Sequence, residues 1–212
     1  MAYKITVNTI EVIIMDRRKR KTRKAIFDAC VALTKEMDFQ QITVNEIVKT
    51  ADINRGTFYL HFEDKFDMMN SFENEMIEKI ENVLLNNLPD EQSNQQFLES
   101  RYTTIIEILQ CYTDNKELLQ LLLRSSNNAS FQLKLREKLK VVLTKQVLPK
   151  ISTHELNIPI DLFVILFTSA SLSLAEYAYQ SDTEFNSEEL ADFLMKIMMQ
   201  GPAKTLGFFQ SE

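Results

Sequence analysis

The chain has 212 residues, 45% of them hydrophobic, which is enough apolar material to fill a core and excludes disorder throughout. Only three glycines and four prolines are present, and helix-forming residues are plentiful, so we expect an all-α fold without a many-stranded sheet. The formal net charge is −6, but residues 1–66 hold twelve Lys and Arg against nine Asp and Glu, whereas the remainder holds twelve against twenty-one. A basic first part joined to an acidic remainder indicates that only the first part meets a polyanion.

The first residues show no helical spacing of apolar side chains, so we expect residues 1–15 to form an extension that is disordered or a short strand. Met15 and Asp16 are followed at once by a basic run, which suggests the hypothesis that translation starts at Met15. No signal peptide is predicted, because the positive cluster follows the short apolar run at residues 12–15. No apolar run reaches the roughly 18 residues of a membrane span. We therefore expect a cytoplasmic protein with no membrane partner.

Apolar residues spaced three and four apart predict a first helix over residues 18–37. Cys30 lies in its apolar stripe and is expected to be a buried small hydrophobe, since Cys30 and Cys111 show no disulfide framework. Seven of the eight residues from Arg17 to Lys24 are basic. This run is either a solvated helix start or, because basic residues there oppose the helix dipole, an arm on phosphates or in the minor groove of DNA.

Two short helices are expected next, separated by a tight turn at residues 51–53. Thr43 and Glu46 have the spacing of a capping box, which predicts the start of the second helix. Asn54 is a favourable N-cap for the third helix, which we expect to extend to Phe62. This pattern is typical of the helix-turn-helix, whose second helix lies in the major groove of DNA.

The third helix carries residue types that suit DNA. Arg55 and Thr57 lie near its N-terminus, where side chains reach base edges and the helix dipole favours phosphate. Gly56 lets the backbone approach the DNA. Further donors are spaced to meet sugar-phosphate oxygens: Tyr59, His61 and Lys65.

The segment from Thr43 to Lys65 resembles the signature of TetR-family regulators, above all in the Thr-Phe-Tyr-x-His-Phe-x-x-Lys core at residues 57–65. The resemblance extends from Arg18 to Phe66 and implies an N-terminal three-helix DNA-binding domain joined through a fourth helix to a larger helical domain. The expected DNA contacts, which include the N-cap residue Asn54, are Thr43, Asn45, Asn54, Arg55, Gly56, Thr57, Tyr59, His61 and Lys65.

One position departs from the family pattern, because the turn usually carries glycine where this chain has Asp52. Aspartate tolerates positive φ better than most residues, so the turn is expected to form with some strain. Phe58 and Phe62 are expected to face inward and anchor the third helix on the first. An ordinary helical hairpin is the alternative, but it leaves the polar residues and the basic run without a role.

Six further helices are expected, which makes about nine in all. Their apolar spacings cover residues 66–84, 97–112, 118–123, 131–147, 162–174 and 190–197. The helix at 162–174 is apolar nearly all round and is expected to be buried on all sides. Small residues follow in the same helix, so with the helix from Ser187 it could form a four-helix interface across a two-fold axis. Packing within one chain is the alternative.

By resemblance, the acidic part serves dimerisation and binds a small apolar or amphipathic effector. An aromatic stripe is more often ordinary core, but several residues could surround a cavity. These candidates are Tyr102, Ile106, Tyr112, Leu123, Phe131, Phe163, Phe167 and Tyr177. Effector binding is expected to favour a dimer whose recognition helices no longer match successive major grooves.

An enzyme is not expected, because two histidines and two cysteines lie far apart and no catalytic, metal-binding or cofactor motif occurs. We predict an extension at residues 1–15, a helix-turn-helix domain at 16–66, and a dimerisation and effector domain at 67–212. The predicted function is a TetR-type repressor that binds palindromic operator DNA as a homodimer and is released by an effector. A ligand-independent interaction module or an activator is the alternative.

Overall fold

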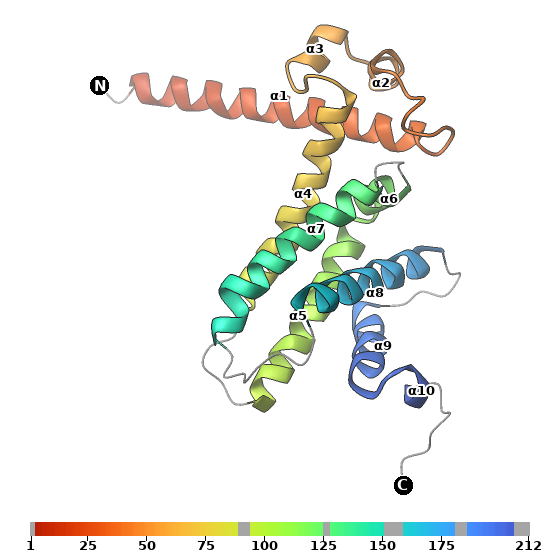
Figure 1. The fold of residues 1–212 in the computed structure, drawn as a ribbon. Helices are drawn as coiled ribbons and strands as arrows, with labels where there is room; N and C mark the ends of the chain where they lie inside the picture. Colours follow the sequence, from red (N-terminus) through yellow and green to blue (C-terminus); the bar gives the residue numbers. More distant parts are fainter. Residues whose placement is uncertain (1–2, 89–93, 125–127, 151–158, 181–185, 206–212) are drawn as a thin grey trace. The chain divides into compact units, whose positions relative to one another are not determined.

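The computed structural model of the chain describes residues 3–88, 94–124, 128–150, 159–180 and 186–205 (Figure 1). Within these ranges the backbone is almost wholly helical and contains no strand, which confirms the all-α fold. The helices are α1 (Tyr3–Leu33), α2 (Val44–Thr50), α3 (Arg55–Tyr59), α4 (Lys65–Asn86), α5 (Asn94–Asp114), α6 (Lys116–Arg124), α7 (Asn128–Val142), α8 (Ile160–Gln180), α9 (Ser187–Gln200) and α10 (Pro202–Thr205). A π turn at Leu143–Val147 and a 3-10 turn at Leu148–Lys150 extend α7. Helices α1–α9 correspond to the nine expected, and α10 is one additional turn.

The chain divides into two compact units. The N-terminal unit comprises Met1–Asn74 with Leu121–Asn128, and the C-terminal unit comprises Glu75–Gln120 with Ala129–Glu212. The division falls within α4, later in the chain than the boundary drawn from the sequence.

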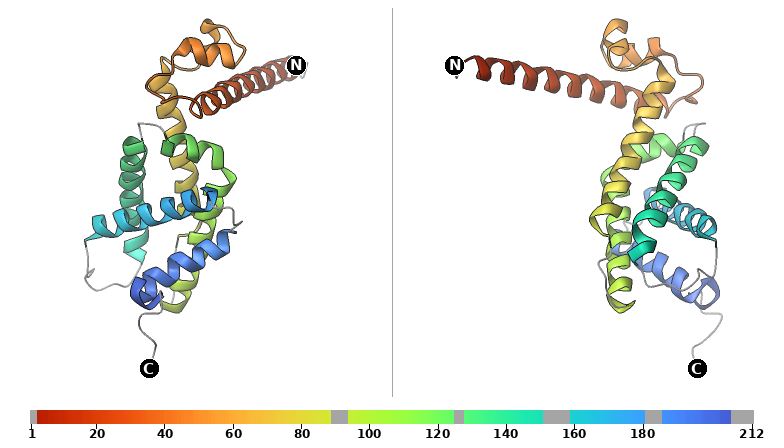
Figure 2. Two further views of the ribbon diagram at one scale, coloured as in Figure 1. Left: turned by 90° about the vertical axis from the view of Figure 1, so that its right-hand side faces the viewer. Right: turned by 60° about the vertical axis from the view of Figure 1, so that its left-hand side comes forward.

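Helix α1 begins earlier and ends earlier than expected. It spans Tyr3–Leu33, so residues 3–15 are helical and the expected strand or disordered extension is not observed. Figure 2 shows α1 as one unbroken helix. The first glycine of the chain is Gly56 and the first proline is Pro89, so no helix-breaking residue stops a helix that has formed downstream from extending toward the N-terminus.

The core of the N-terminal unit contains aromatic side chains from α3, α4 and the segment between them. Phe58 is fully buried, and its ring centroid lies 5.8 Å from that of Phe62, which lies 6.0 Å from that of Phe72. The inward orientation of Phe58 and Phe62 is therefore confirmed, with α4 as an additional packing partner. Cys30 is also fully buried, as expected, and burial raises its pKa to about 12.

The C-terminal unit is organised around α5, which contacts both α8 and α9. The two views of Figure 2 show α8 crossing α5. Large side chains from four helices are buried in this unit: Tyr112, Phe131, Leu135, Leu172 and Leu194. Each such side chain stabilises the folded state by about 1.5–3 kcal/mol relative to an exposed one.

Helix α8 corrects two expectations. It is not buried on all sides, because Leu162, Ile165 and Leu166 are 45%, 43% and 59% exposed. By length and composition α8 is also apolar enough to cross a membrane, although no such run was recognised in the sequence. Val164 and Leu172 on its other face are buried within the unit. We therefore interpret α8 as a core helix with one uncovered apolar face.

Candidate nucleic-acid interface

The helix-turn-helix begins with a capping box at α2. The Thr43 hydroxyl accepts a hydrogen bond from the Glu46 N–H at 3.3 Å, and the Glu46 carboxylate accepts one from the Thr43 N–H at 2.8 Å. These bonds confirm the predicted helix start, and the Thr43 N–H bond is the main cause that lowers the pKa of Glu46. Asn45, in the first turn, is exposed to solvent.

The turn between α2 and α3 passes through Asp52, whose φ is +52°. Among the described residues other than glycine, Asp52 alone has a positive φ. This confirms that aspartate occupies the left-handed position, which costs an L-residue roughly 1–2 kcal/mol. The adjacent Ile53 N–H donates to the Val48 carbonyl at 3.0 Å and closes the turn.

Asn54 caps α3, as predicted from the sequence. Its Oδ1 accepts hydrogen bonds from the Thr57 N–H at 2.7 Å and from the Thr57 hydroxyl at 3.0 Å. A Cβ added to Gly56 would lie 3.3 Å from the same oxygen, which is tighter than ordinary contact. Gly56 therefore leaves room for the cap.

Arg55 and Tyr59 form an exposed pair on α3. The Arg55 Nη2 donates to the Tyr59 hydroxyl at 3.0 Å, and the guanidinium carbon lies 5.7 Å from the Tyr59 ring centroid. The Tyr59 ring packs edge-on against Phe58, with the centroids 5.5 Å apart. The buried Phe58 thus supports Tyr59, and Tyr59 orients the guanidinium before any partner binds.

Lys65 makes contacts that were not anticipated from the sequence. Its Nζ donates to the carbonyls of Phe39, Gln40 and Ile42 at 3.1, 2.7 and 2.7 Å. An ammonium group has three N–H donors, so all are occupied and none remains for a phosphate. Lys65 therefore ties the start of α4 to the connector between α1 and α2.

His61 is partly buried beside the basic face of α1. Burial, followed by the positive charges of Lys19 and Arg23, lowers the pKa of His61. The imidazole is consequently neutral at neutral pH, and one ring nitrogen still carries a donor N–H.

The basic run on α1 contains two kinds of residue. The Arg23 Nη2 donates to the Ser71 hydroxyl at 3.0 Å, and its guanidinium lies 5.3 Å from the ring centroids of Phe62 and Phe72. Arg23 thus braces α1 against α4. Residues 17–21 are exposed to solvent and remain accessible to a polyanion.

Leu60 was not singled out from the sequence. It is 84% exposed at the C-cap of α3, between Tyr59 and His61. The sequence signal that could have identified it is the position of this apolar residue between two polar candidates for DNA contact. Its side chain has the chemistry to contact a thymine methyl group.

Comparison with known proteins agrees with this geometry. Residues 26–71 match the family described as bacterial regulatory proteins, tetR family, and residues 99–200 match a transcriptional regulator C-terminal region. The chain belongs to the TetR family. It is therefore a transcription regulator and not an enzyme.

Individual relatives are more distant. An uncharacterized HTH-type transcriptional regulator, YxbF of Bacillus subtilis (strain 168), is 39% identical over 57 residues, which are 27% of this chain and 15% of that protein. The chain thus spans only a small part of this curated relative. A TetR transcriptional regulator from Streptococcus agalactiae 2603V has a TM-score of 0.57 at 21% identity, covering 88% of this chain and 98% of that one. NalD of Pseudomonas aeruginosa has a TM-score of 0.61 at 19% identity, covering 87% and 96%. At these identities the structural likeness concerns the fold.

The effector residues expected in this TetR-family regulator fall in different environments. Tyr112 and Phe131 are buried, Ile106 is half-buried, and the Phe163 and Phe167 rings stack with centroids 6.0 Å apart. The Tyr102 hydroxyl donates to Asp192 Oδ1 at 2.7 Å. Leu123 belongs to the N-terminal unit.

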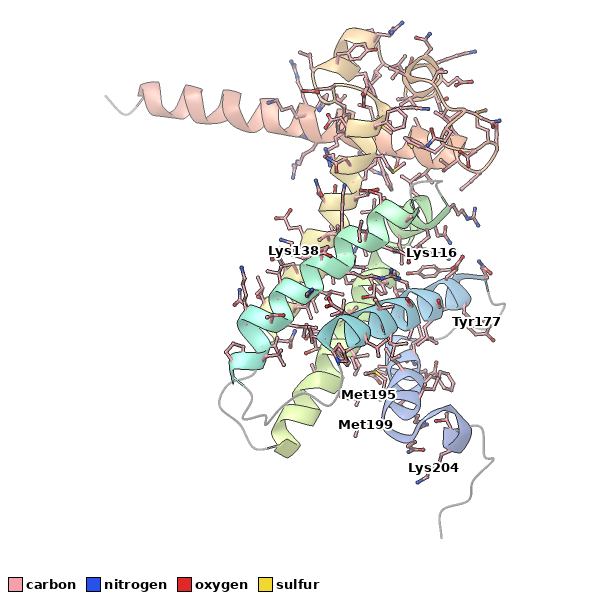
Figure 3. All side chains as sticks on the ribbon, in the orientation of Figure 1. Lys116, Lys138, Tyr177, Met195, Met199 and Lys204 are labelled. Atoms are coloured by element: carbon pink, nitrogen blue, oxygen red, sulfur yellow. The ribbon has the colours of Figure 1, made fainter. Side chains whose placement is uncertain are left out.

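Tyr177 is 59% exposed and lies on the outside of α8 (Figure 3). It therefore does not line an interior cavity of the single chain. No cluster of three His, Cys, Asp or Glu side chains that could hold a metal ion occurs in the described part of the chain.

Proposed function

We propose that this regulator binds palindromic operator DNA as a homodimer, through α3 of each subunit. The observation that carries the proposal is the exposed Arg55–Tyr59 pair on α3, the second helix of a helix-turn-helix. A guanidinium held in place can bind the O6 and N7 acceptors of a guanine together. Oriented donors of this kind suit the reading of base edges.

Further contacts follow from the exposed surface around the pair. Asn54 uses its Oδ1 in the helix cap, so its amide nitrogen is available as a donor to phosphate. The complete proposed set is Thr43, Asn45, Asn54, Arg55, Gly56, Thr57, Tyr59 and His61. Lys65 is left out because its three donors already bind carbonyls.

The exposed basic residues 17–21 are proposed to act as an arm on the phosphates that flank the site. Removing residues 1–20 then lowers the slope of log affinity against log salt concentration. An unchanged slope contradicts the arm.

The uncovered apolar surface of α8 and α9 supports the homodimer. On α8 it includes Leu162, Leu166 and Tyr177, spaced for one helical face, and on α9 it includes Phe193 and Ile197, four residues apart. Monomeric soluble proteins rarely leave such a surface open to water. A two-fold axis through it pairs α8 and α9 with their copies in a four-helix interface.

Repression and release by an effector are the remaining parts of the proposal. NalD is named as the secondary repressor of the MexAB-OprM multidrug efflux pump, and repression is proposed here on that analogy. The buried aromatic residues Tyr112 and Phe131 of the C-terminal unit are the proposed surroundings of a small effector.

Selection of genomic DNA fragments by the purified protein, followed by footprinting, tests the proposed function. The expected result is a palindrome whose half-sites lie one or more helical turns apart. Enrichment no greater than for random DNA contradicts operator binding and favours an interaction module.

A further inference from the structure

Arg136 of α7 is a partly buried cation that has no counterion among the described residues. Its Nε is inaccessible to solvent and has no hydrogen-bond partner among the described residues. Its Nη2 donates to two neutral oxygens, Gln132 Oε1 at 3.0 Å and Ser169 Oγ at 3.1 Å. The guanidinium thus has an unsatisfied donor and contacts with only neutral acceptors, although charge-assisted bonds are roughly twice as strong.

Neighbouring cations on the same helix are neutralised. Lys138, labelled in Figure 3, lies 2.9 Å from the carboxylate of Glu81, and Lys140 lies 2.7 Å from that of Asp161. Arg136 differs from both because the described residues place no carboxylate within ion-pair distance. An uncompensated cation that has lost part of its hydration destabilises the folded protein.

A second unsatisfied group lies on the helix that faces Arg136. Thr168 precedes Ser169 on α8 and is fully buried, yet its hydroxyl has no hydrogen-bond partner within the described part of the chain. Buried polar groups are normally paired, but three donors on α7 and α8 have no partner among the described residues: Arg136 Nε, Thr168 Oγ1 and Tyr179 Oη. A bound acceptor beside Ser169 would satisfy Arg136 Nε.

The two helices that Arg136 joins also bury large apolar side chains. Phe131 and Leu135, on the same helix, are fully buried, and Val164 and Leu172 of α8 are nearly so. A fully hydrated inorganic anion would gain little there, whereas an apolar organic body would gain from leaving water.

We propose that Arg136 binds the carboxylate of an organic acid with an apolar body, and that this acid is the effector class of the regulator. The proposal rests on the effector site proposed above and adds a residue that the sequence had not indicated. The carboxylate accepts from Arg136 Nε and replaces a neutral acceptor at Nη2, since one edge of a guanidinium binds two carboxylate oxygens.

Calorimetric titration with decanoate and with 1-decanol tests the proposal, because the two probes share an apolar tail and differ in the carboxylate. Decanoate is expected to bind the wild type at least tenfold more tightly than decanol, and Arg136→Met to remove that preference. Lys138→Met is the matched control, since it removes a paired cation from the same helix and should keep the preference. Equal affinity of the wild type for both probes, or no binding of decanoate, overturns the proposal, as does decanoate binding that Arg136→Met leaves unchanged.

Thermal unfolding without a probe separates this role from a structural one. A binding residue that lacks its anion destabilises the protein, so Arg136→Met should raise Tm by a few degrees. A structural residue joining α7 to α8 gives the opposite sign, and a lowered Tm in Arg136→Met contradicts the proposal. Decanoate should raise the Tm of the wild type and of Lys138→Met by mass action.

Operator binding by the same wild-type preparation separates the two proposals. A preparation that binds its operator but shows no preference for decanoate overturns the effector class alone. One that prefers decanoate but enriches no DNA overturns the proposed function and leaves a carboxylate site without a regulatory role.

Discussion

The two surfaces proposed to bind partners are built in opposite ways. Around α3 the exposed residues are mainly polar, and hydrogen bonds hold them before any partner arrives, as in the Arg55–Tyr59 pair and the Asn54 cap. Along α8 and α9 the exposed residues are apolar, including Leu166 and Ile197, and gain stability only when covered. The comparison indicates that a specific polar surface depends on hydrogen bonds that hold its side chains in place. A surface for subunit association depends instead on the apolar area that it buries and on its shape.

The largest effect is expected from a charge on the apolar surface. Leu166→Glu places a carboxylate of each subunit in the proposed interface and should yield a monomer in sedimentation experiments. Operator affinity should fall at least about a hundredfold, because the second half-site no longer binds as part of the same molecule. Leu133→Glu is the matched control, since Leu133 on α7 is 60% exposed and Leu166 is 59% exposed. If both variants lose the dimer to a similar extent, the proposal that α8 forms the dimer interface is contradicted.

A smaller effect is expected on the polar surface. Arg55→Ala should weaken operator binding by about 1–3 kcal/mol and relax specificity at one base pair, without changing the dimer. Gel-shift titration with the selected operator and its single-base variants measures both changes. Lys145→Ala, the same charge change at an exposed site of the C-terminal unit, is the control. If both variants lose affinity equally, Arg55 contributes only general charge.

A variant of Lys65 tests whether this residue stabilises the fold around α3 or contacts DNA. Lys65→Met removes three bonds to carbonyls and should lower the free energy of unfolding in urea by roughly 1.5–3 kcal/mol. Since no donor remains for a phosphate, the salt dependence of operator binding by the folded variant should match the wild type. A reduced salt slope would show that Lys65 contacts DNA after all.

Replacing Asp52 in the turn between α2 and α3 by glycine is expected to stabilise the protein. Asp52→Gly should raise the free energy of unfolding by about 0.5–1 kcal/mol, because glycine adopts a positive φ without steric cost but loses more backbone entropy on folding. Asp52→Val should lower it, since a β-branched residue fits this conformation poorly. Urea unfolding of the two variants and the wild type measures the difference, and the reverse order contradicts the strain.

The smallest effect concerns pH. Because the pKa of His61 in the folded protein lies below its ordinary value of 6.5, the unfolded chain takes up the proton more readily. The contribution of His61 to stability is therefore present above pH 6.5 and is lost as pH falls through the folded pKa. His61→Gln should show a smaller decrease in Tm than the wild type over this window, and an identical decrease assigns the pH dependence to other groups.

Short-range signals accounted for much of the DNA-binding region. The capping box at Thr43, the cap at Asn54, the left-handed Asp52 and the inward Phe58 were all predicted from residues within a few positions of one another. Each depends on backbone geometry that a few neighbouring residues determine. The helical start of α1 was missed because its apolar residues lack a period, and periodicity detects only helices that bury one face.

The sequence by itself determined the all-α class, the order of the helices and the helix-turn-helix, because spacing and capping chemistry act within a few residues. The family followed from the resemblance of residues 43–65 to the TetR signature. Only the tertiary structure showed that Lys65 holds backbone carbonyls and that α8 keeps an uncovered apolar face. It also showed that no carboxylate in the described part of the chain pairs with Arg136. These properties depend on which groups from distant parts of the chain meet. A residue's own neighbours in sequence do not determine whether its charge is paired or its apolar side chain is covered.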